Sequence, residues 1–261
     1  DEWDAFAARM VDAQAPGAAS RLRSLGNVAA GRPDGWPERL LSGMAMLHLL
    51  CEAYASADGP LRDEVRTLLG WNASREEILA GPRVQDEWAV LARVVIEQER
   101  LTVQRTWLWG HDHERAALLL DFAPPGAPLT PRPPAGTSFD AGLAFYPGAT
   151  PLRALLDAPG ELREAPGFFG VEGVDVALRA CVAAVAANPW AEEHPIALAR
   201  AVADLDVVSA QDGSLPLRGS MRARWKLLAL SAGRPVSVFG LWDGEGLAPL
   251  AVGDGERTVA L

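Results

Sequence analysis

In residues 1–81 the apolar side chains recur every three or four positions, which is the period of amphipathic helices. Trp3, Phe6 and Met10 begin the pattern, and a second helix is predicted over residues 18–30. A third helix begins near Pro37, and we expect its apolar stripe to be buried: Leu40, Met44, Leu47, His48, Cys51 and Tyr54. Two shorter helices follow, over residues 61–69 and after Ser74, where Ser74 and Glu77 have the spacing of a capping box.

From residue 84 to residue 122 the period changes to two, which predicts three antiparallel strands in a meander. The turns are expected at residues 97–100 and in the GHDHER segment, residues 110–115. One face of the first strand is predicted to carry Trp88, Val90, Ala92, Val94 and Ile96. In the second strand Thr102, Gln104 and Thr106 alternate with apolar residues, so this polar face is expected to meet solvent.

The remaining segments predict a helix between two groups of strands. Residues 123–135 are too rich in proline for a strand or helix, which leaves an ordered extended loop or a linker. A fourth strand is expected in SFDAGLAFYP, a helix over residues 174–188, and further strands around the Asp-Gly turns at Asp212, Asp243 and Asp254. Residues 222–230 fit a strand or a short helix. The segments WLWGHDHE and GLWDGEG look alike but are too short to indicate a repeat.

These patterns together predict an α+β protein: a helical N-terminal part, an antiparallel β-meander, then a helix and a second β-rich module. The expected domains are residues 1–82, residues 83–158 with the proline-rich loop, and residues 159–261. A chain of 261 residues with 49% apolar residues is long enough to bury a core.

Charge and cysteine content narrow the class of function. The net charge is −10, with 34 acidic and 24 basic residues, which disfavours a general nucleic-acid-binding surface. Cys51 and Cys181 are too few for a disulfide framework, so a cytoplasmic protein is expected. The opening residues lack the apolar core of a signal peptide, and no apolar run is long enough to span a membrane. The chain begins at Asp1 rather than methionine, which indicates a fragment or a processed product.

Candidate metal ligands and catalytic groups are sparse. His111 and His113 offer two imidazoles, but zinc prefers three or four ligands and a solvated hairpin turn is favoured. His48 and Cys51 lie on the apolar stripe, which favours a core role. Asp212, Asp243 and Asp254 precede glycine, as turns require, although together with Glu245 they could also supply the paired carboxylates of a hydrolase. No G-x-S-x-G motif is present, and the glycine-rich GFFGVEG segment lacks the lysine of a phosphate-binding loop.

Two further groups are candidates for binding macromolecules. Trp88, Trp107 and Trp109 on the meander form either an exposed protein-interaction patch or part of the core, and the core is favoured. The densest basic cluster is Arg218, Arg222, Arg224 and Lys226, which is either a phosphate-contacting surface or a solvated face.

Several segments resemble the region that follows the zinc finger in bacterial SWIM zinc-finger proteins: ARMVDAQAPGAASRLR, GWPERLL, VQRTWLWG, LLLDFAPPGAPL and FDAGLAFYPGATPLRALL. The resemblance continues into WKLLALSAGRPVSVFGLWDG and covers most of the chain. The finger of that family is a C-x-C…C-x-H zinc site, and this chain contains neither motif. The resemblance therefore implies a region whose finger lies upstream, or a protein that has lost the finger. Zinc is expected only if an upstream finger exists, and no cofactor is expected in this chain.

The resemblance also implies partners, because such proteins tend to be encoded near MoxR-type AAA ATPases and von Willebrand A proteins. We therefore expect a non-catalytic protein-interaction or scaffold region of a multi-protein bacterial assembly. The alternatives are a nucleic-acid-binding region that acts with an upstream SWIM finger, and a carboxylate-dependent hydrolase.

Overall fold

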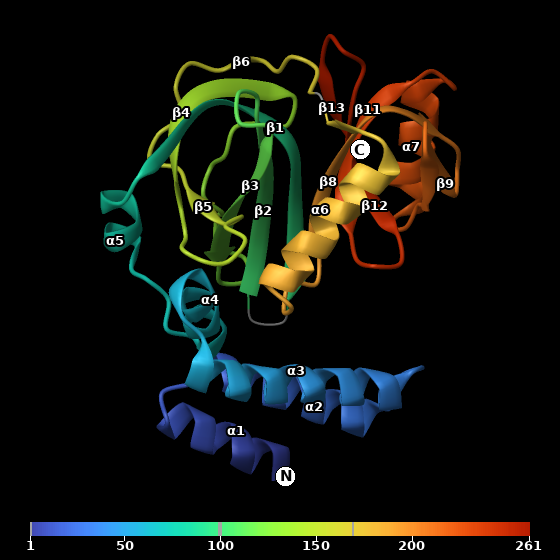
Figure 1. Cartoon of the computed structure of the whole chain (residues 1–261). Helices are drawn as coiled ribbons and strands as arrows, with labels where there is room; N and C mark the ends of the chain where they lie inside the picture. Colours follow the sequence, from blue (N-terminus) through green and yellow to red (C-terminus); the bar gives the residue numbers. More distant parts are fainter. Residues whose placement is uncertain (1, 99–100, 169) are drawn as a thin grey trace. The chain divides into compact units, whose positions relative to one another are not determined.

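The computed structural model describes residues 2–98, 101–168 and 170–261, and the chain divides into two units (Figure 1). The helical unit contains residues 1–77 with residues 147–150, and the barrel unit contains residues 78–146 and 151–261. Helices come first and antiparallel sheets follow, so the α+β class is confirmed.

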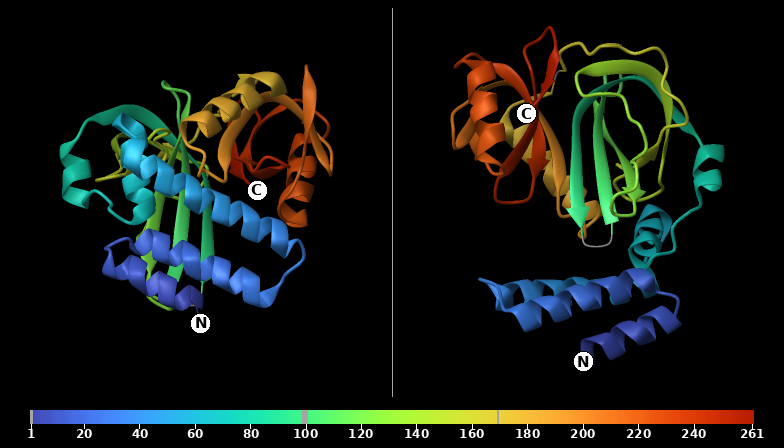
Figure 2. Two further views of the ribbon diagram at one scale, coloured as in Figure 1. Left: turned by 60° about the horizontal axis from the view of Figure 1, so that its bottom comes forward. Right: turned by 180° about the vertical axis from the view of Figure 1, so that it is seen from behind.

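The helical unit contains α1 (Glu2–Asp12), α2 (Pro16–Gly31), α3 (Trp36–Ser56) and α4 (Gly59–Leu69), and α5 (Arg75–Ala80) follows. A proline in the first turn begins each of α2, α3 and α4, because a fixed φ suits that position. The predicted capping box is confirmed: the Ser74 amide donates to Glu77 Oε2 at 2.7 Å, and the Glu77 amide donates to Ser74 Oγ at 3.2 Å. In Figure 2, α2 lies between α1 and α3.

The expectation of a buried stripe on α3 is wrong. Leu50 is the buried residue of this helix, while four members of the predicted stripe are exposed: Met44, His48, Cys51 and Tyr54. The helix is apolar on nearly every side, so periodicity alone does not select the packed face. Gly43 marks the face of α3 that packs against α2, because a Cβ at that position would lie 2.3 Å from Leu25 Cδ2 of α2.

The first sheet of the barrel unit closes on itself. It is built from β1 (Arg83–Gln98), β2 (Leu101–Gly110), β3 (Arg115–Ala123), β4 (Thr137–Phe145) and β5 (Ala154–Leu155), with β6 (Arg163–Glu164) beside β4. The strand order is β3-β2-β1-β4-β5. A parallel bridge between Leu118 and Arg153 then joins β3 to the start of β5, and the Leu118 amide donates to Leu152 O at 2.8 Å. The result is a five-stranded barrel, called the first barrel below.

The second sheet is introduced by β7 (Val171–Glu172) and α6 (Val174–Ala187). It contains β8 (His194–Ala203), β9 (Val207–Ala210), β10 (Gly213–Pro216), β11 (Val236–Trp242), β12 (Leu247–Gly253) and β13 (Thr258–Ala260), with α7 (Met221–Ser231) between β10 and β11. The order is β10-β9-β8-β11-β12-β13, and a parallel bridge between Leu217 and Leu247 joins the end of β10 to β12. Strands β8 to β12 form the second barrel. Residues 222–230, left open between strand and helix, belong to helix α7.

Both barrels have the same connectivity. Around each, the strands follow in the order first, second, third, fifth, fourth and back to the first, and the third and fifth are parallel. This is the order of the five-stranded Greek-key barrel known as the OB-fold. The similar segments WLWGHDHE and GLWDGEG lie at the β2–β3 and β11–β12 turns, which are different places in that order. The duplication is therefore one of topology, without a sequence repeat.

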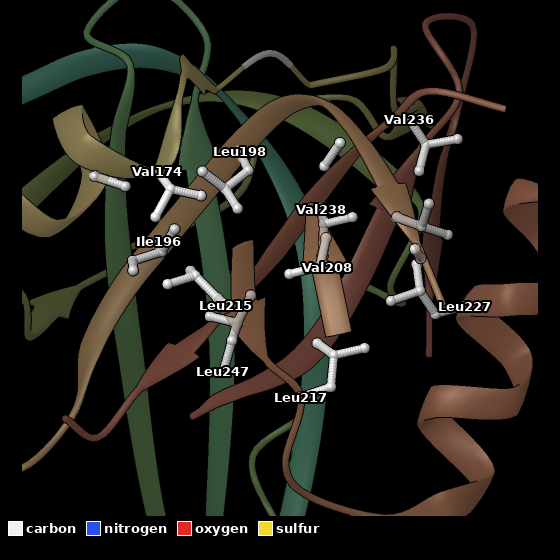
Figure 3. Packing of buried hydrophobic residues seen from close by; sticks show 14 of the residues in the cluster. Val174, Ile196, Leu198, Val208, Leu215, Leu217, Leu227, Val236, Val238 and Leu247 are labelled. Atoms are coloured by element: carbon white, nitrogen blue, oxygen red, sulfur yellow. The ribbon is translucent and has the colours of Figure 1, made fainter. Parts of the chain in front are cut away.

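Three clusters of buried side chains organise the barrel unit. The interior of the first barrel contains Trp88, Leu108, Phe139 and Leu143, and the interior of the second contains Leu198, Val208, Leu215 and Val238 (Figure 3). A third cluster joins the outer faces of the barrels. There Phe239 of β11 packs against Trp107 of β2 with ring centroids 6.0 Å apart.

Two expectations about strand faces are wrong. A bulge between Val90 and Ala92 shifts the register of β1, so Trp88 and Val90 face the barrel interior while Ala92 packs between the barrels. Gln104 and Thr106 of β2 are buried rather than solvated, because closure of the sheet places their face inside the barrel. The expected turn at residues 97–100 falls partly on residues 99 and 100, outside the described residues, and β1 extends to Gln98.

The other turns are confirmed. A β-turn follows β2 at residues 111–114, and Asp212, Asp243 and Asp254 each lie in a turn between consecutive strands. The proline-rich segment is an ordered loop held to the first barrel, because Gln104 Nε2 donates to Thr130 O at 2.9 Å. Strand β4 and helix α6 form where the sequence predicts them.

Candidate functional site

His111 and His113 occupy the turn between β2 and β3, and a buried carboxylate organises this turn. Asp86 of β1 accepts the amides of Asp112 at 2.9 Å and His113 at 3.0 Å, and His113 Nδ1 lies 2.8 Å from Asp86 Oδ2. His111 is exposed. The hydrogen bonds of Asp86 are therefore made within the turn, and they stabilise its conformation. Within residues 2–98, 101–168 and 170–261, no group of three or more His, Cys, Asp or Glu side chains has the geometry to hold a metal ion.

Contacts within the chain engage three members of the predicted basic cluster. Arg218 pairs with Asp243 and Glu245, and Arg224 Nη1 lies 2.7 Å from Asp206 Oδ1. Lys226 Nζ donates to Ala260 O at 2.6 Å. Arg222 is exposed on α7. Three of the four cations would therefore have to exchange a protein contact for a phosphate, which weakens the case for a phosphate-binding surface.

The three candidate tryptophans do not form an exposed patch. Trp88 is buried in the first barrel, where its Nε1 donates to Ala141 O at 3.0 Å. Trp107 is buried between the barrels, and Trp109 is partly buried beside Phe239 with centroids 6.3 Å apart. The burial of Trp88 and Trp107 corrects the patch interpretation and agrees with the core alternative.

The candidate hydrolase carboxylates each serve a different local structure. Asp212, in the β9–β10 turn, accepts the amides of Val174 at 2.7 Å and Asp175 at 3.0 Å and so caps α6. These hydrogen bonds hold the pKa of Asp212 below its usual value. Asp243 and Asp254 accept amides within their own turns. These hydrogen bonds account for all three Asp-Gly sequences without a shared active site.

Sequence patterns did not reveal a buried polar cluster inside the first barrel. Arg132 of the proline-rich loop forms a two-pronged pair with Asp121 of β3, Nε to Oδ2 at 2.8 Å and Nη2 to Oδ1 at 2.7 Å. Gln104 lies opposite Asp121 on β2, and the buried Thr106 hydroxyl has no hydrogen-bond partner among the described residues. Burial alone would raise the pKa of Asp121, but the hydrogen bonds and charge of Arg132 outweigh it and the pKa is lowered.

The isolated thiols and histidines differ in burial. Burial raises the pKa of the Cys181 thiol to about 11, which makes it a poor nucleophile, whereas Cys51 is exposed on α3. Burial also lowers the pKa of His194 at the start of β8. The exposed His48 lies beside Cys51 on α3 rather than in a core.

The helical unit carries the feature that the sequence concealed. Its buried apolar residues are mainly alanine, and none of the three large buried clusters of the molecule lies in this unit. By contrast, large apolar side chains on α1 and α3 are exposed: Phe6, Val11, Leu41 (72% exposed), Met44, Leu49 and Tyr54. Such a concentration of exposed apolar side chains is typical of an interaction surface.

Comparison with protein families finds a match in the helical unit. Residues 1–69 match the model of the SWIM-associated four-helix bundle domain, and this segment contains α1, α2, α3 and α4. The match supports the resemblance to SWIM-family proteins over the helical segment. No curated protein and no solved structure matches the chain. No helix of the described residues is long and apolar enough to cross a bilayer.

Proposed function

We propose that this chain is a non-catalytic protein-interaction region of a SWIM-family protein, working in the cytoplasm as part of a bacterial multi-protein assembly. The observation that carries the proposal is the exposed apolar face of α3. Its outward positions include Leu41, Ala45, His48 and Leu49, at helical spacing. Glu52, one turn further along α3, adds a charged residue at the end of this face.

The chemistry of this face favours a helix as the partner element. A long helix with small and medium apolar residues accepts the apolar side of an amphipathic partner helix, as in helix-in-groove recognition. Each large side chain removed from water there contributes roughly 1.5–3 kcal/mol to binding. Leu41 and Leu49, which are two turns apart, are therefore the expected anchors.

The partners proposed from family association are a MoxR-type AAA ATPase and a von Willebrand A protein. Each is purified and titrated against the immobilised chain by biolayer interferometry. We expect one of them to bind, and the Leu41→Glu, Leu49→Glu double variant to weaken that binding at least tenfold.

The matched control is the Val176→Glu, Val182→Glu double variant, which places the same two charges at exposed valines (49% and 69%) on helix α6 of the barrel unit. Binding that is lost in the control, or retained in the α3 variant, contradicts the assignment of the surface. Binding to neither candidate leaves the family association without support.

A second candidate function is nucleic-acid binding, and the OB-type strand order favours it. Such barrels bind oligonucleotides on the outer face of their second and third strands. In the first barrel, however, that face carries Trp107 and Leu118 and is covered by the second barrel. Salt-dependent DNA binding that is weakened by Arg222→Glu would favour this alternative, and its absence at low salt removes it.

A further inference from the structure

Strand β1 has a free edge. It pairs with β2 as far as Gln98, but its pairing with β4 covers only Arg83–Ala89. One more hydrogen bond on the β4 side links the Gly136 amide to Val90 O at 2.9 Å. Among the described residues, therefore, the backbone from residue 93 to residue 97 is paired with a strand on the β2 side alone.

This edge has an apolar centre between two charged residues. Val95 is 47% exposed and Ile96 is 38% exposed, and no proline interrupts the segment. Proteins usually shorten or interrupt such edges because unpaired N–H and C=O groups invite another strand. The free edge of β1 carries charges at its two ends, Arg93 and Glu97, and none at its centre.

The two charges at the ends of this edge have no charged neighbour across β2. Arg93 lies opposite Thr106, and Glu97 lies opposite Thr102. Both side chains are exposed. The edge thus presents a positive end, an apolar centre of Val94, Val95 and Ile96, and a negative end. When two copies of this edge run in opposite directions, the positive end of one lies opposite the negative end of the other, and the apolar centres meet.

We propose that two copies of this chain pair through the free edge of β1, antiparallel, about a two-fold axis at Val95. The axis places Val95 against its own copy and Val94 against Ile96 of the second copy. It also places Arg93 against Glu97 of the second copy, twice by symmetry. A closed two-fold interface of this kind uses the same surface on both partners and leaves no edge for further growth.

The charges select this arrangement over the alternatives. Parallel pairing in register would set Arg93 against Arg93 and Glu97 against Glu97 of the second copy, and like charges directly opposite are unfavourable. An antiparallel register shifted by two residues in either direction sets Glu97 against an apolar residue, Leu91 or Val95 of the second copy. The interface belongs to the barrel unit and stands whether or not α3 binds its own partner.

Sedimentation analytical ultracentrifugation of the full chain over a wide concentration series tests the proposal. We expect a reversible dimer in the wild type. Arg93→Glu and Glu97→Arg each replace two attractive pairs by two repulsive ones, so each is expected to raise the dimer dissociation constant about tenfold. The double variant Arg93→Glu, Glu97→Arg restores the opposite pairs and is expected to recover dimerisation.

Arg179→Glu serves as the matched control, because Arg179 is an exposed arginine of α6 paired within its own helix to Asp175. Circular dichroism verifies that each variant keeps its fold. Restoration by the double variant supports the pairing. A wild type that is monomeric at every concentration overturns the proposal. So does a dimer that ignores the single reversals, or a double variant as weak as the single ones.

Discussion

The buried pair of Arg132 and Asp121 offers the sharpest test of the first barrel. The Arg132→Met variant keeps most of the apolar stem of the side chain and removes the guanidinium. Asp121 is only 8% exposed. Without its two hydrogen bonds from Arg132 the carboxylate is left with Gln104 Nε2, at 3.4 Å, and the side chain of Thr130. A buried charge that loses its partner typically costs 3–5 kcal/mol, so we expect the unfolding free energy to fall by about 3 kcal/mol.

The same pair predicts a dependence on pH. In the wild type the pKa of Asp121 is lowered, so its stabilising contribution is present above the unfolded value and is lost as the pH falls through the folded value. In Arg132→Met, burial is opposed only by the hydrogen bonds of Gln104 and Thr130, so the pKa of Asp121 is expected to rise. The loss of unfolding free energy in Arg132→Met, relative to the wild type, should therefore become smaller as the solution is acidified and Asp121 becomes protonated.

Urea unfolding followed by tryptophan fluorescence measures both effects. Arg179→Met is the control, because its pair with Asp175 is exposed and such pairs contribute little to stability. The Asp121→Leu, Arg132→Met double variant should be more stable than Arg132→Met alone, since it leaves no unpaired charge. If Arg132→Met costs no more than the control, the buried pair does not hold the loop to the barrel.

Three further predictions concern single side chains. Asp212→Ala removes the cap of α6 and is expected to lower the thermal unfolding midpoint, whereas Asp212→Asn keeps an acceptor and should lower it less. Ellman's reagent should titrate Cys51 in the native protein and Cys181 only after denaturation, and equal rates would contradict the burial of Cys181. The pKa of His194 is lowered, so the unfolded state binds its proton more readily and stability should fall as the pH drops below about 6.5. His194→Gln should remove that part of the slope in urea midpoints, and an unchanged slope contradicts it.

Local signals in the sequence predict most elements of the fold. Prolines mark the beginnings of helices, Ser74 and Glu77 form their capping box, and glycine after Asp212 marks a turn, because each depends on neighbours in the chain. The period of two identifies the meander for the same reason. These features need no knowledge of the tertiary structure.

The wrong predictions concern strand faces, which depend on pairing between residues far apart in the sequence. One extra residue in the bulge after Val90 reverses which side of β1 faces inward, and periodicity does not register it. The alternation in β2 predicts that Gln104 and Thr106 meet solvent. The bridge between Leu118 and Arg153 closes the barrel, and both side chains lie inside it. Closure also depends on pairings between distant strands, so the repeated barrel topology leaves no repeat in the sequence.

The candidate sites follow the same division. The sequence correctly favoured turns for Asp243 and Asp254, because Asp-Gly pairs have a local meaning. The sequence pattern predicted the wrong buried face for α3, because a helix that is apolar on most sides does not indicate which side its neighbours cover. The exposed face that supports a protein partner is therefore visible only in the structure.

Hydrogen–deuterium exchange on the chain with and without a bound partner, either the MoxR-type ATPase or the von Willebrand A protein, tests the protein-interaction function most directly. The account predicts slower exchange in α3 over residues 41–55 when the partner is bound, with little change in the strands of either barrel. Unchanged α3 exchange, with protection confined to the barrels, would contradict it.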